Sequence, residues 1–213
     1  MSEIVKVENV TKYFKHEKVL DDVNMNLETG HIYGIVGKNG AGKTVLFKII
    51  AGFIKPSSGK VTVAGKIIGV DRDFPDSLGL IIETPGFLSQ YNAYQNLLYL
   101  ANINNKISKE DVKESIRMVG LDRGSNKKVG KFSLGMRQRL GIAQAIMENP
   151  NLIILDEPMN GLDKKGIEDV KELLLKLKGD GKTILMASHY AEDMEICDEV
   201  FQMEDGKLGD MKK

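Results

Sequence analysis

Hydrophobic and polar residues alternate with a period of two in the first part of this chain. The alternation covers residues 4–11 and 19–27, and it predicts two strands that each bury one face. The two segments are close in sequence, which favours antiparallel pairing. Short apolar runs predict further strands at 31–37, 60–64, 79–82, 151–155, 183–188 and 199–203.

Between these strands the apolar residues follow a helical period. It predicts helices at 43–52, 93–103, 164–179 and 190–197, the first of them closed by Gly52. Ser108 and Asp111 have the spacing of a capping box, which predicts one more helix that ends near Gly120.

The order of these elements predicts an α/β fold. Strands that alternate with helices form a mostly parallel sheet covered on both faces. We expect a single domain, with residues 1–84 and 132–213 forming the core and an N-terminal antiparallel β subdomain. The segment from about 85 to 131 breaks the alternation, and we interpret it as an inserted helical subdomain.

Composition and charge exclude several classes of protein. The 213 residues are 42% hydrophobic and 28% charged, and 30 basic residues balance 30 acidic ones. A chain without net charge is unlike a dedicated nucleic-acid binder, so we expect no nucleic-acid partner. The single cysteine rules out an intrachain disulfide and fits a reducing, cytoplasmic compartment. No apolar run has the length needed to cross a bilayer, so work at a membrane would need a separate partner.

The clearest chemical motif is GKNGAGKT at residues 37–44, between a predicted strand and a predicted helix. It fits the phosphate-binding pattern G-x-x-x-x-G-K-[ST]. Glycines allow the backbone N–H groups to turn towards a phosphate, Lys43 adds a full positive charge, and Thr44 offers a hydroxyl to Mg²⁺. The alternative is a glycine-rich turn with a chance lysine. The predicted nucleotide-binding residues are Gly37, Lys38, Asn39, Gly40, Ala41, Gly42, Lys43, Thr44 and Val45.

Two carboxylates follow a second buried strand, in LIILDEP at residues 152–158. Asp156 would stand at the carboxyl end of its strand, where sheets of this class bind ligands. Asp156 is predicted to hold Mg²⁺ through water, and Glu157 to orient or deprotonate an attacking water. Both can serve one site only if the chain bends at Pro158; otherwise the pair is a solvated acidic turn. His189 ends a later strand and is either a structural histidine or a group that reaches the γ-phosphate.

Taken in order, the motifs GKNGAGKT, IIETPGF, FSLGMRQRL, LIILDEP and NGLD resemble those of the nucleotide-binding domain of ATP-binding cassette (ABC) transporters. The resemblance covers about residues 3–208. It implies that Ser133 and Gly135 complete the ATP site of a second copy, or of a related cassette, across a head-to-tail dimer. It also implies that Asp163 lies in a loop between the two sites and that Phe14 stacks on adenine, although Phe14 could simply pack at a strand end.

Four positions depart from the usual family pattern. Leu134 and Met136 replace the first glycine and the glutamine of the signature L-S-G-G-Q. Glu83 stands where the family usually has a glutamine that contacts Mg²⁺, and the pattern Glu-x-Pro-Gly-Phe resembles bacitracin- and lantibiotic-type resistance exporters. Because of this resemblance, Glu83 is interpreted as a functional substitution; the alternative is a slow or partly degenerate site. Val45 stands where the family commonly has a second threonine.

The resemblance implies an ATPase that energises a separate membrane permease. Lys43, Glu157 and His189 would be catalytic, and Thr44, Asp156 and Glu83 would surround Mg²⁺. The cassette would lie at the inner face of the cell membrane and drive export of a drug, peptide antibiotic or lantibiotic. Three alternatives stay open: a P-loop kinase or GTPase, a soluble ABC ATPase that acts on nucleic acid or ribosomes, and a regulatory cassette that does not hydrolyse ATP.

Overall fold

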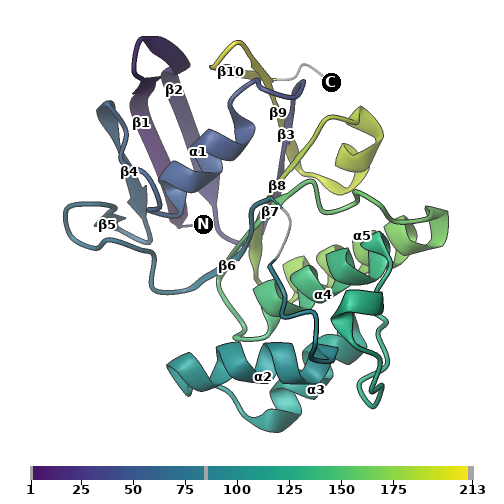
Figure 1. Cartoon of the computed structure of the whole chain (residues 1–213). Coiled ribbons are helices and arrows are strands. Elements are labelled where there is room, and N and C mark those ends of the chain that lie inside the picture. The colour runs from purple at the N-terminus through teal and green to yellow at the C-terminus, as the bar shows by residue number, and fades with distance from the viewer. Residues whose placement is uncertain (1, 84–85, 211–213) are drawn as a thin grey trace.

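The computed structural model describes residues 2–83 and 86–210, and within them the strands form two sheets (Figure 1). The first is an antiparallel sheet with the order β2-β1-β4-β5, and the second is a six-stranded sheet with the order β10-β9-β3-β8-β7-β6. The strands of the first sheet are β1 (Glu3–Phe14), β2 (Glu17–Glu28), β4 (Ser58–Val63) and β5 (Lys66–Ile67). Those of the second are β3 (Ile32–Val36), β6 (Leu78–Ile81), β7 (Leu152–Asp156), β8 (Thr183–Ser188), β9 (Glu199–Glu204) and β10 (Lys207–Asp210).

Five neighbouring strands of the second sheet run parallel. β3 pairs with β8 and β9, β8 pairs with β7, and β7 pairs with β6. Only β10, which follows β9 through a tight turn, is antiparallel. Parallel strands bring their carboxyl ends to one edge of the sheet. The segments that follow β3, β6, β7 and β8 therefore meet there, and each of them carries a predicted site residue.

Helical segments lie between the parallel strands, because parallel neighbours need a crossover connection rather than a tight turn. In the described part of the chain the α-helices are α1 (Lys43–Ile50), α2 (Ala93–Asn104), α3 (Lys109–Met118), α4 (Leu134–Ile146) and α5 (Lys164–Gly179), and the short 3₁₀ segments are η1 (Val129–Lys131) and η2 (Ala191–Ile196). The predicted capping box is present, since Ser108 accepts a hydrogen bond from the backbone of Asp111 and Asp111 accepts one from Ser108. In Figure 1, α2 and α3 lie together at the end of the molecule away from the antiparallel sheet.

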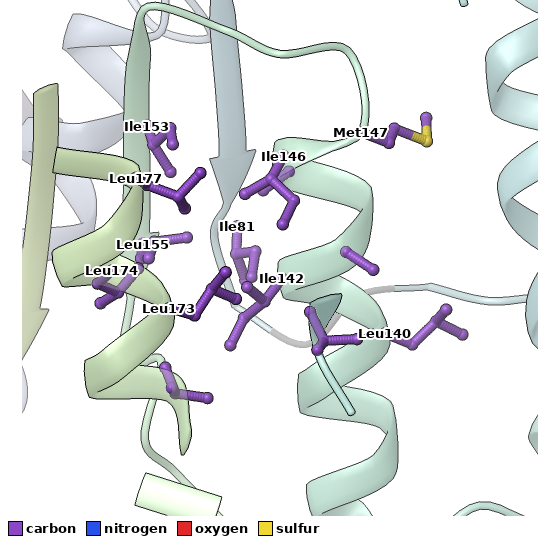
Figure 2. Packing of buried hydrophobic residues seen from close by; sticks show 14 of the residues in the cluster. Ile81, Leu140, Ile142, Ile146, Met147, Ile153, Leu155, Leu173, Leu174 and Leu177 are labelled. Carbon is purple, nitrogen blue, oxygen red and sulfur yellow. The ribbon is translucent and has the colours of Figure 1, made fainter. Parts of the chain in front are cut away.

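Residues on β7 alternate between two hydrophobic clusters, one on each face of the core sheet. Ile153 and Leu155 belong to the cluster that α4 and α5 cover (Figure 2), whereas Leu152 and Ile154 belong to the cluster that holds α1 and the antiparallel sheet. All five residues of β7 are buried, as the apolar run LIILD predicted. The core sheet is thus held from both faces, which fixes the edge where the site residues meet.

The structure confirms the predicted fold class and the positions of most elements, with two differences. The segment predicted as a helix at 190–197 is a single 3₁₀ segment, η2, in the short connection between β8 and β9, where the tighter 3₁₀ turn is common. The sequence analysis also missed β5 and β10, which follow β4 and β9 through turns with glycine at positive φ, Gly65 and Gly206. Residues 84–85 of IIETPGF lie outside the described residues.

Candidate nucleotide-binding and catalytic site

The predicted phosphate loop lies between β3 and α1, as its sequence context required. At Gly42, with φ of 110°, the backbone enters α1, and a Cβ there would lie 2.8 Å from Leu20 Cδ2 and 2.9 Å from the carbonyl oxygen of Val19. Only glycine fits this close approach and this left-handed backbone. The loop is thereby held directly beside β2, with the amino end of α1 facing the carboxyl edge of the sheet.

Lys43 and Thr44 begin α1 and connect the loop to the buried strand β7. The Lys43 ammonium donates hydrogen bonds to the carbonyl oxygens of Gly37 and Lys38, over 2.5 and 3.2 Å, and its side chain is only 6% exposed. The hydroxyl of Thr44 donates to Oδ2 of Asp156 over 2.6 Å. Two motifs that are separated by 112 residues in sequence are therefore in direct contact.

Asp156 is the most strongly buried carboxylate of the site. Its residue is 7% exposed, and this burial raises the pKa of its carboxyl above the ordinary value. The hydrogen bond from Thr44 and the charge of Lys43 lower the pKa, while the nearby charges of Glu157 and Glu83 raise it further. A carboxylate that is desolvated and crowded by other carboxylates gains from a nearby cation, so Asp156 is suited to face one.

Glu157 points into the same site because the backbone turns at Glu157 itself. Its φ is 52°, so the predicted bend occurs one residue before Pro158. The turn is fixed on both sides, since the N–H of Glu157 donates to Ala187 O and its carbonyl accepts from Gln138 Nε2 over 3.0 Å. A left-handed backbone at a non-glycine residue costs about 1–3 kcal/mol and is frequent at functional positions.

The carboxylate of Glu157 lies between two cationic or hydrogen-bonding groups. Its Oε2 is 2.9 Å from Nδ1 of His189, and its Oε1 is 3.8 Å from Nζ of Lys43. His189 follows the carboxyl end of β8, as predicted, and its ring can donate to the carboxylate when the proton is on Nδ1. The structure thus brings Lys43, Thr44, Asp156, Glu157 and His189 together at one edge of the sheet.

Four of these residues border a hollow of about 390 Å³, whose walls are formed by Val19, by residues 39–45, and by Asp156 and Glu157. His189, Gly37 and Lys38 lie instead in the wall of an adjoining hollow that shares residues 39–41 with the first. Val19 of β2 was missed by the sequence analysis, because only the packing of β2 against the loop places it there. Phe14, the predicted adenine contact, is 45% exposed at the end of β1 and is not part of the wall; Lys12 Nζ lies 5.1 Å from the centre of its ring.

Glu83 follows β6 at the same edge of the sheet, but its carboxylate is paired with another group. Oε1 of Glu83 lies 2.6 Å from Nζ of Lys48 on α1. Its φ of 61° is again left-handed. Glu83 therefore lies near the predicted metal residues, as its electrostatic effect on Asp156 indicates, without contacting Thr44 or Asp156 in the described hydrogen bonds.

The predicted signature residues lie outside the hollow, on α4 and its N-cap. Ser133 caps α4 by accepting a hydrogen bond from the backbone N–H of Met136 over 3.2 Å. Leu134 is 56% exposed and packs on Gly161, where a Cβ would lie 2.4 Å from Leu134 Cδ2. Asp163 caps α5 through the N–H of Gly166. Within one chain, Ser133, Gly135 and Asp163 thus do not line the hollow.

The signature segment FSLGMRQRL contains two arginines, Arg137 and Arg139. Arg139 donates to the carbonyl oxygen of Val119 at the end of α3 and pairs with Asp169 on α5. Arg137 is partly buried. Arg139 is thus engaged by contacts within its own chain.

Comparison with known proteins identifies the source of these motifs. The family model described as ABC transporter matches residues 20–160. This chain belongs to the ABC transporter family. It is similar to the ABC transporter ATP-binding protein YybJ of Bacillus subtilis, which is 44% identical with 99% of this chain and 97% of that protein covered. The bacitracin transport ATP-binding protein BcrA of Bacillus licheniformis is 41% identical, with 98% and 69% covered, and the lantibiotic transport ATP-binding protein SrtF of Streptococcus pyogenes is 35% identical, with 96% and 89% covered.

Solved ABC cassettes confirm the fold. The cassette MJ0796, in a dimeric post-hydrolysis state bound to ADP and phosphate, superposes with a TM-score of 0.88 at 26% identity, covering 99% of this chain and all of that one. The ADP conformation of MJ1267 superposes with a TM-score of 0.80 at 25% identity, with 98% and 90% covered. The chain is an ATP-binding subunit of an ABC transporter and an ATPase. Among the described residues, no helix has the length and apolar character of a membrane span.

Proposed function

We propose that this ABC cassette hydrolyses Mg-ATP to drive export of a drug, peptide antibiotic or lantibiotic through a separate permease. The observation that carries the hydrolytic site is the contact of Lys43, Thr44, Asp156, Glu157 and His189 at one sheet edge. Export is supported by the similarity to bacitracin and lantibiotic transport proteins and by Glu83 in IIETPGF. The cassette would lie at the inner face of the cell membrane through that permease.

A magnesium ion is compatible with the donors at this site. Thr44 Oγ1 and Asp156 Oδ2 are hard oxygen ligands 2.6 Å apart, and Mg²⁺ is usually held by one or two carboxylates together with substrate phosphates and water. Within residues 2–83 and 86–210, no three His, Cys, Asp or Glu side chains form a metal cluster of their own. When bound, Mg²⁺ would neutralise charge on the β- and γ-phosphates.

The residues of the chain then have distinct roles in hydrolysis. Lys43 and the N–H groups of residues 38–44 would stabilise the negative charge on the γ-phosphoryl oxygens. Glu157 would orient the attacking water and accept its proton, while His189 would hold the Glu157 carboxylate in place. Phe14 would stack on adenine from its exposed position at the end of β1.

A second cassette would complete the site. Ser133 and Gly135 are at the exposed amino end of α4, where the helix dipole favours an anion. Since they do not line the hollow of their own chain, we propose that they contact the γ-phosphate bound by a second copy or a related cassette, with Asp163 at the loop between the sites. The dimeric form of MJ0796 supports this arrangement.

The permease would dock between the core sheet and the helical segment. A groove of about 400 Å³ runs from the end of α1 to α2, and its walls include Phe53, Phe74, Leu80, Leu100 and Ile103. Phe53 and Phe74 are more than half exposed and contact each other edge to face. Leu80 lies on β6, three residues before Glu83, so a partner in this groove would sense movement of Glu83. We propose that residues 86–132 carry this movement.

An ATPase assay with a size measurement tests the hydrolytic part of this proposal. Glu157→Gln keeps the shape of the side chain and removes its ability to accept a proton, so we expect turnover to fall at least 100-fold while ATP still produces a dimer. Size-exclusion chromatography with light scattering, with and without ATP, detects the dimer. Unchanged turnover of Glu157→Gln would contradict the role given to Glu157.

Export is tested separately, in cells that carry the cassette together with a candidate permease. We expect resistance to bacitracin or a lantibiotic with the native cassette and none with Glu157→Gln. The double variant Phe53→Asp/Phe74→Asp should retain ATP-dependent dimers and lose co-purification with the permease. Retained co-purification would place the docking surface elsewhere.

A further inference from the structure

Among the described contacts, the carboxylate of Glu83 pairs only with Lys48, which lies on α1. The ammonium of Lys48 is 2.6 Å from Oε1 of Glu83. Thr44 precedes Lys48 by four residues on the same helix, so both side chains lie on one face, about one turn or ~5.4 Å apart along the axis. The Glu83 carboxylate is therefore paired with the residue one helical turn after Thr44, whose hydroxyl faces the proposed metal position.

The surroundings of Glu83 favour this pairing over a position closer to Asp156. Asp156 is buried, and Glu157 follows it directly, so the metal position is already crowded by two carboxylates. A third carboxylate would be repelled there unless a cation compensates it. Lys48 is a cation within reach, and at 32% side-chain exposure it is partly screened from solvent.

The backbone at Glu83 connects this ion pair to the rest of the chain. Glu83 has a left-handed φ of 61° two residues after Ile81, the last residue of β6 in the core sheet. Glu83 thus stands just beyond a strand that pairs with β7 inside the core sheet, and Leu80 of the same strand lies in the wall of the proposed permease groove.

From this geometry we propose that Lys48 is a positioning residue that competes with the nucleotide-bound metal ion for the carboxylate of Glu83. The inference rests on the metal-facing role proposed for Glu83 above. In one arrangement Glu83 pairs with Lys48, as described; in the other it turns along α1 to the ion held by Thr44 and Asp156, and Lys48 is released.

The competition predicts that removing Lys48 strengthens metal binding. Lys48→Met keeps much of the side-chain length and removes the charge. The probe is Mn²⁺, followed by electron paramagnetic resonance, with a non-hydrolysable ATP analogue present. We expect the Kd for Mn²⁺ to fall about two- to fivefold, the range that an exposed ion pair can contribute. Lys48→Arg, which retains the charge, should keep the Kd of the native protein.

A second background separates competition from a general effect of charge. In Glu83→Gln the amide cannot pair with Lys48 as an anion, so adding Lys48→Met should leave the Kd for Mn²⁺ unchanged. An equal gain in both backgrounds would overturn the proposal, because it would show a through-space effect alone. Lys60→Met, which removes a lysine that pairs with Glu8 on the antiparallel sheet, controls for net charge.

The outcomes also distinguish this inference from the proposed role of Glu83. If Glu83→Gln weakens Mn²⁺ binding and Lys48→Met has no effect, Glu83 is a metal contact and Lys48 is not its competitor. If neither variant changes the Kd for Mn²⁺, the metal-facing role of Glu83 itself is wrong. Thermal unfolding of each variant without nucleotide checks that both proteins remain folded.

Discussion

The phosphate-loop side of the site and the signature side differ in how far one chain completes them. At the first, Lys43, Thr44, Glu157 and His189 contact one another or the backbone of the loop, and Asp156 is buried among them. At the second, Ser133 bonds only to its own helix among the described contacts, and Leu134 is more than half exposed. One side is preorganised by folding, and the other is presented on the surface.

This difference separates what each side can contribute. Charges that are already held in place cost no reorganisation when a phosphate arrives, so the loop side can bind nucleotide within a single chain. An exposed helix end gains its anion only when another molecule supplies one. We therefore expect substitutions on the loop side to weaken nucleotide binding directly, and those on the signature side to act on dimer formation.

The largest effect is expected for Lys43→Ala. Lys43 contributes a buried positive charge at the phosphates, and a hydrogen bond to a charged group is worth about 1.5–3 kcal/mol. ATP affinity should fall about 10- to 100-fold in a fluorescent-nucleotide titration of the monomer, and turnover should be lost. Lys38→Ala, at an exposed side chain in the same loop, is the matched control. Equal losses of ATP affinity in both variants would contradict a specific role for the buried charge of Lys43.

The next largest effect is expected for Ser133→Asp on the signature side. Aspartate is as good an N-cap as serine, so the free energy of unfolding should stay within about 0.5 kcal/mol of that of the native chain. Its charge would face the partner's phosphate, and ATP-dependent dimers of the Glu157→Gln protein should be lost. Ser133→Ala removes the cap instead and should cost about 0.5–2 kcal/mol of stability. If Ser133→Asp still dimerised with ATP, the signature would not contact phosphate.

Much of the phosphate-loop side could be predicted from the sequence, because its residues lie in local motifs. GKNGAGKT fixed the strand, turn and helix around Lys43 and Thr44, and LIILD fixed a fully buried strand before Glu157. Such segments carry their own periodicity and glycine requirements. The position of the bend at Glu157 was predicted one residue late, since it depends on a hydrogen bond donated to Ala187 and one accepted from Gln138, both distant in sequence.

Features that depend on packing between distant segments could not be predicted. Val19 lines the hollow only because β2 lies beside the loop, and Lys48 meets Glu83 only because α1 packs next to the end of β6. Neither Val19 nor Lys48 belongs to a sequence motif that would indicate its contact. The division of the chain into a core and an inserted helical subdomain stays a prediction, although α2 and α3 do lie within 85–131.

A smaller effect is expected where the signature meets the NGLD loop. In Gly161→Ala the new Cβ would meet Leu134 Cδ2 at 2.4 Å, at a residue with φ of 74°, and we expect a loss of about 1–3 kcal/mol in urea unfolding. Leu134→Ala removes the clashing atoms but not the backbone strain. The double variant should therefore lose less stability than the sum of the single ones. Strict additivity would show that Leu134 does not hold this loop.

The smallest effect is expected far from both sides, at Asp198. Partial burial raises the pKa of its carboxyl, but the ion pair with Lys178 and the N–H of Ile32 lower it more, so the pKa lies below the ordinary value. A lowered pKa in the folded state stabilises the protein above the ordinary pKa of about 3.9, and this stabilisation is lost as the pH falls through the folded-state pKa.

Asp198→Asn keeps an acceptor for Ile32 and loses the ion pair. We expect a loss of about 0.5–1 kcal/mol in urea unfolding at pH 7, which shrinks as the pH approaches 3. Lys178→Met should show the same loss, and the double variant should add little to it, because both substitutions remove one contact. ATP affinity and ATP-dependent dimers should stay unchanged in all three variants, since Asp198 is at the amino end of β3, opposite the edge that holds the phosphate loop. A change in ATP affinity or in ATP-dependent dimers would mean that the loop side and the signature side are coupled through the core sheet. The two sides would then differ in position but not in function.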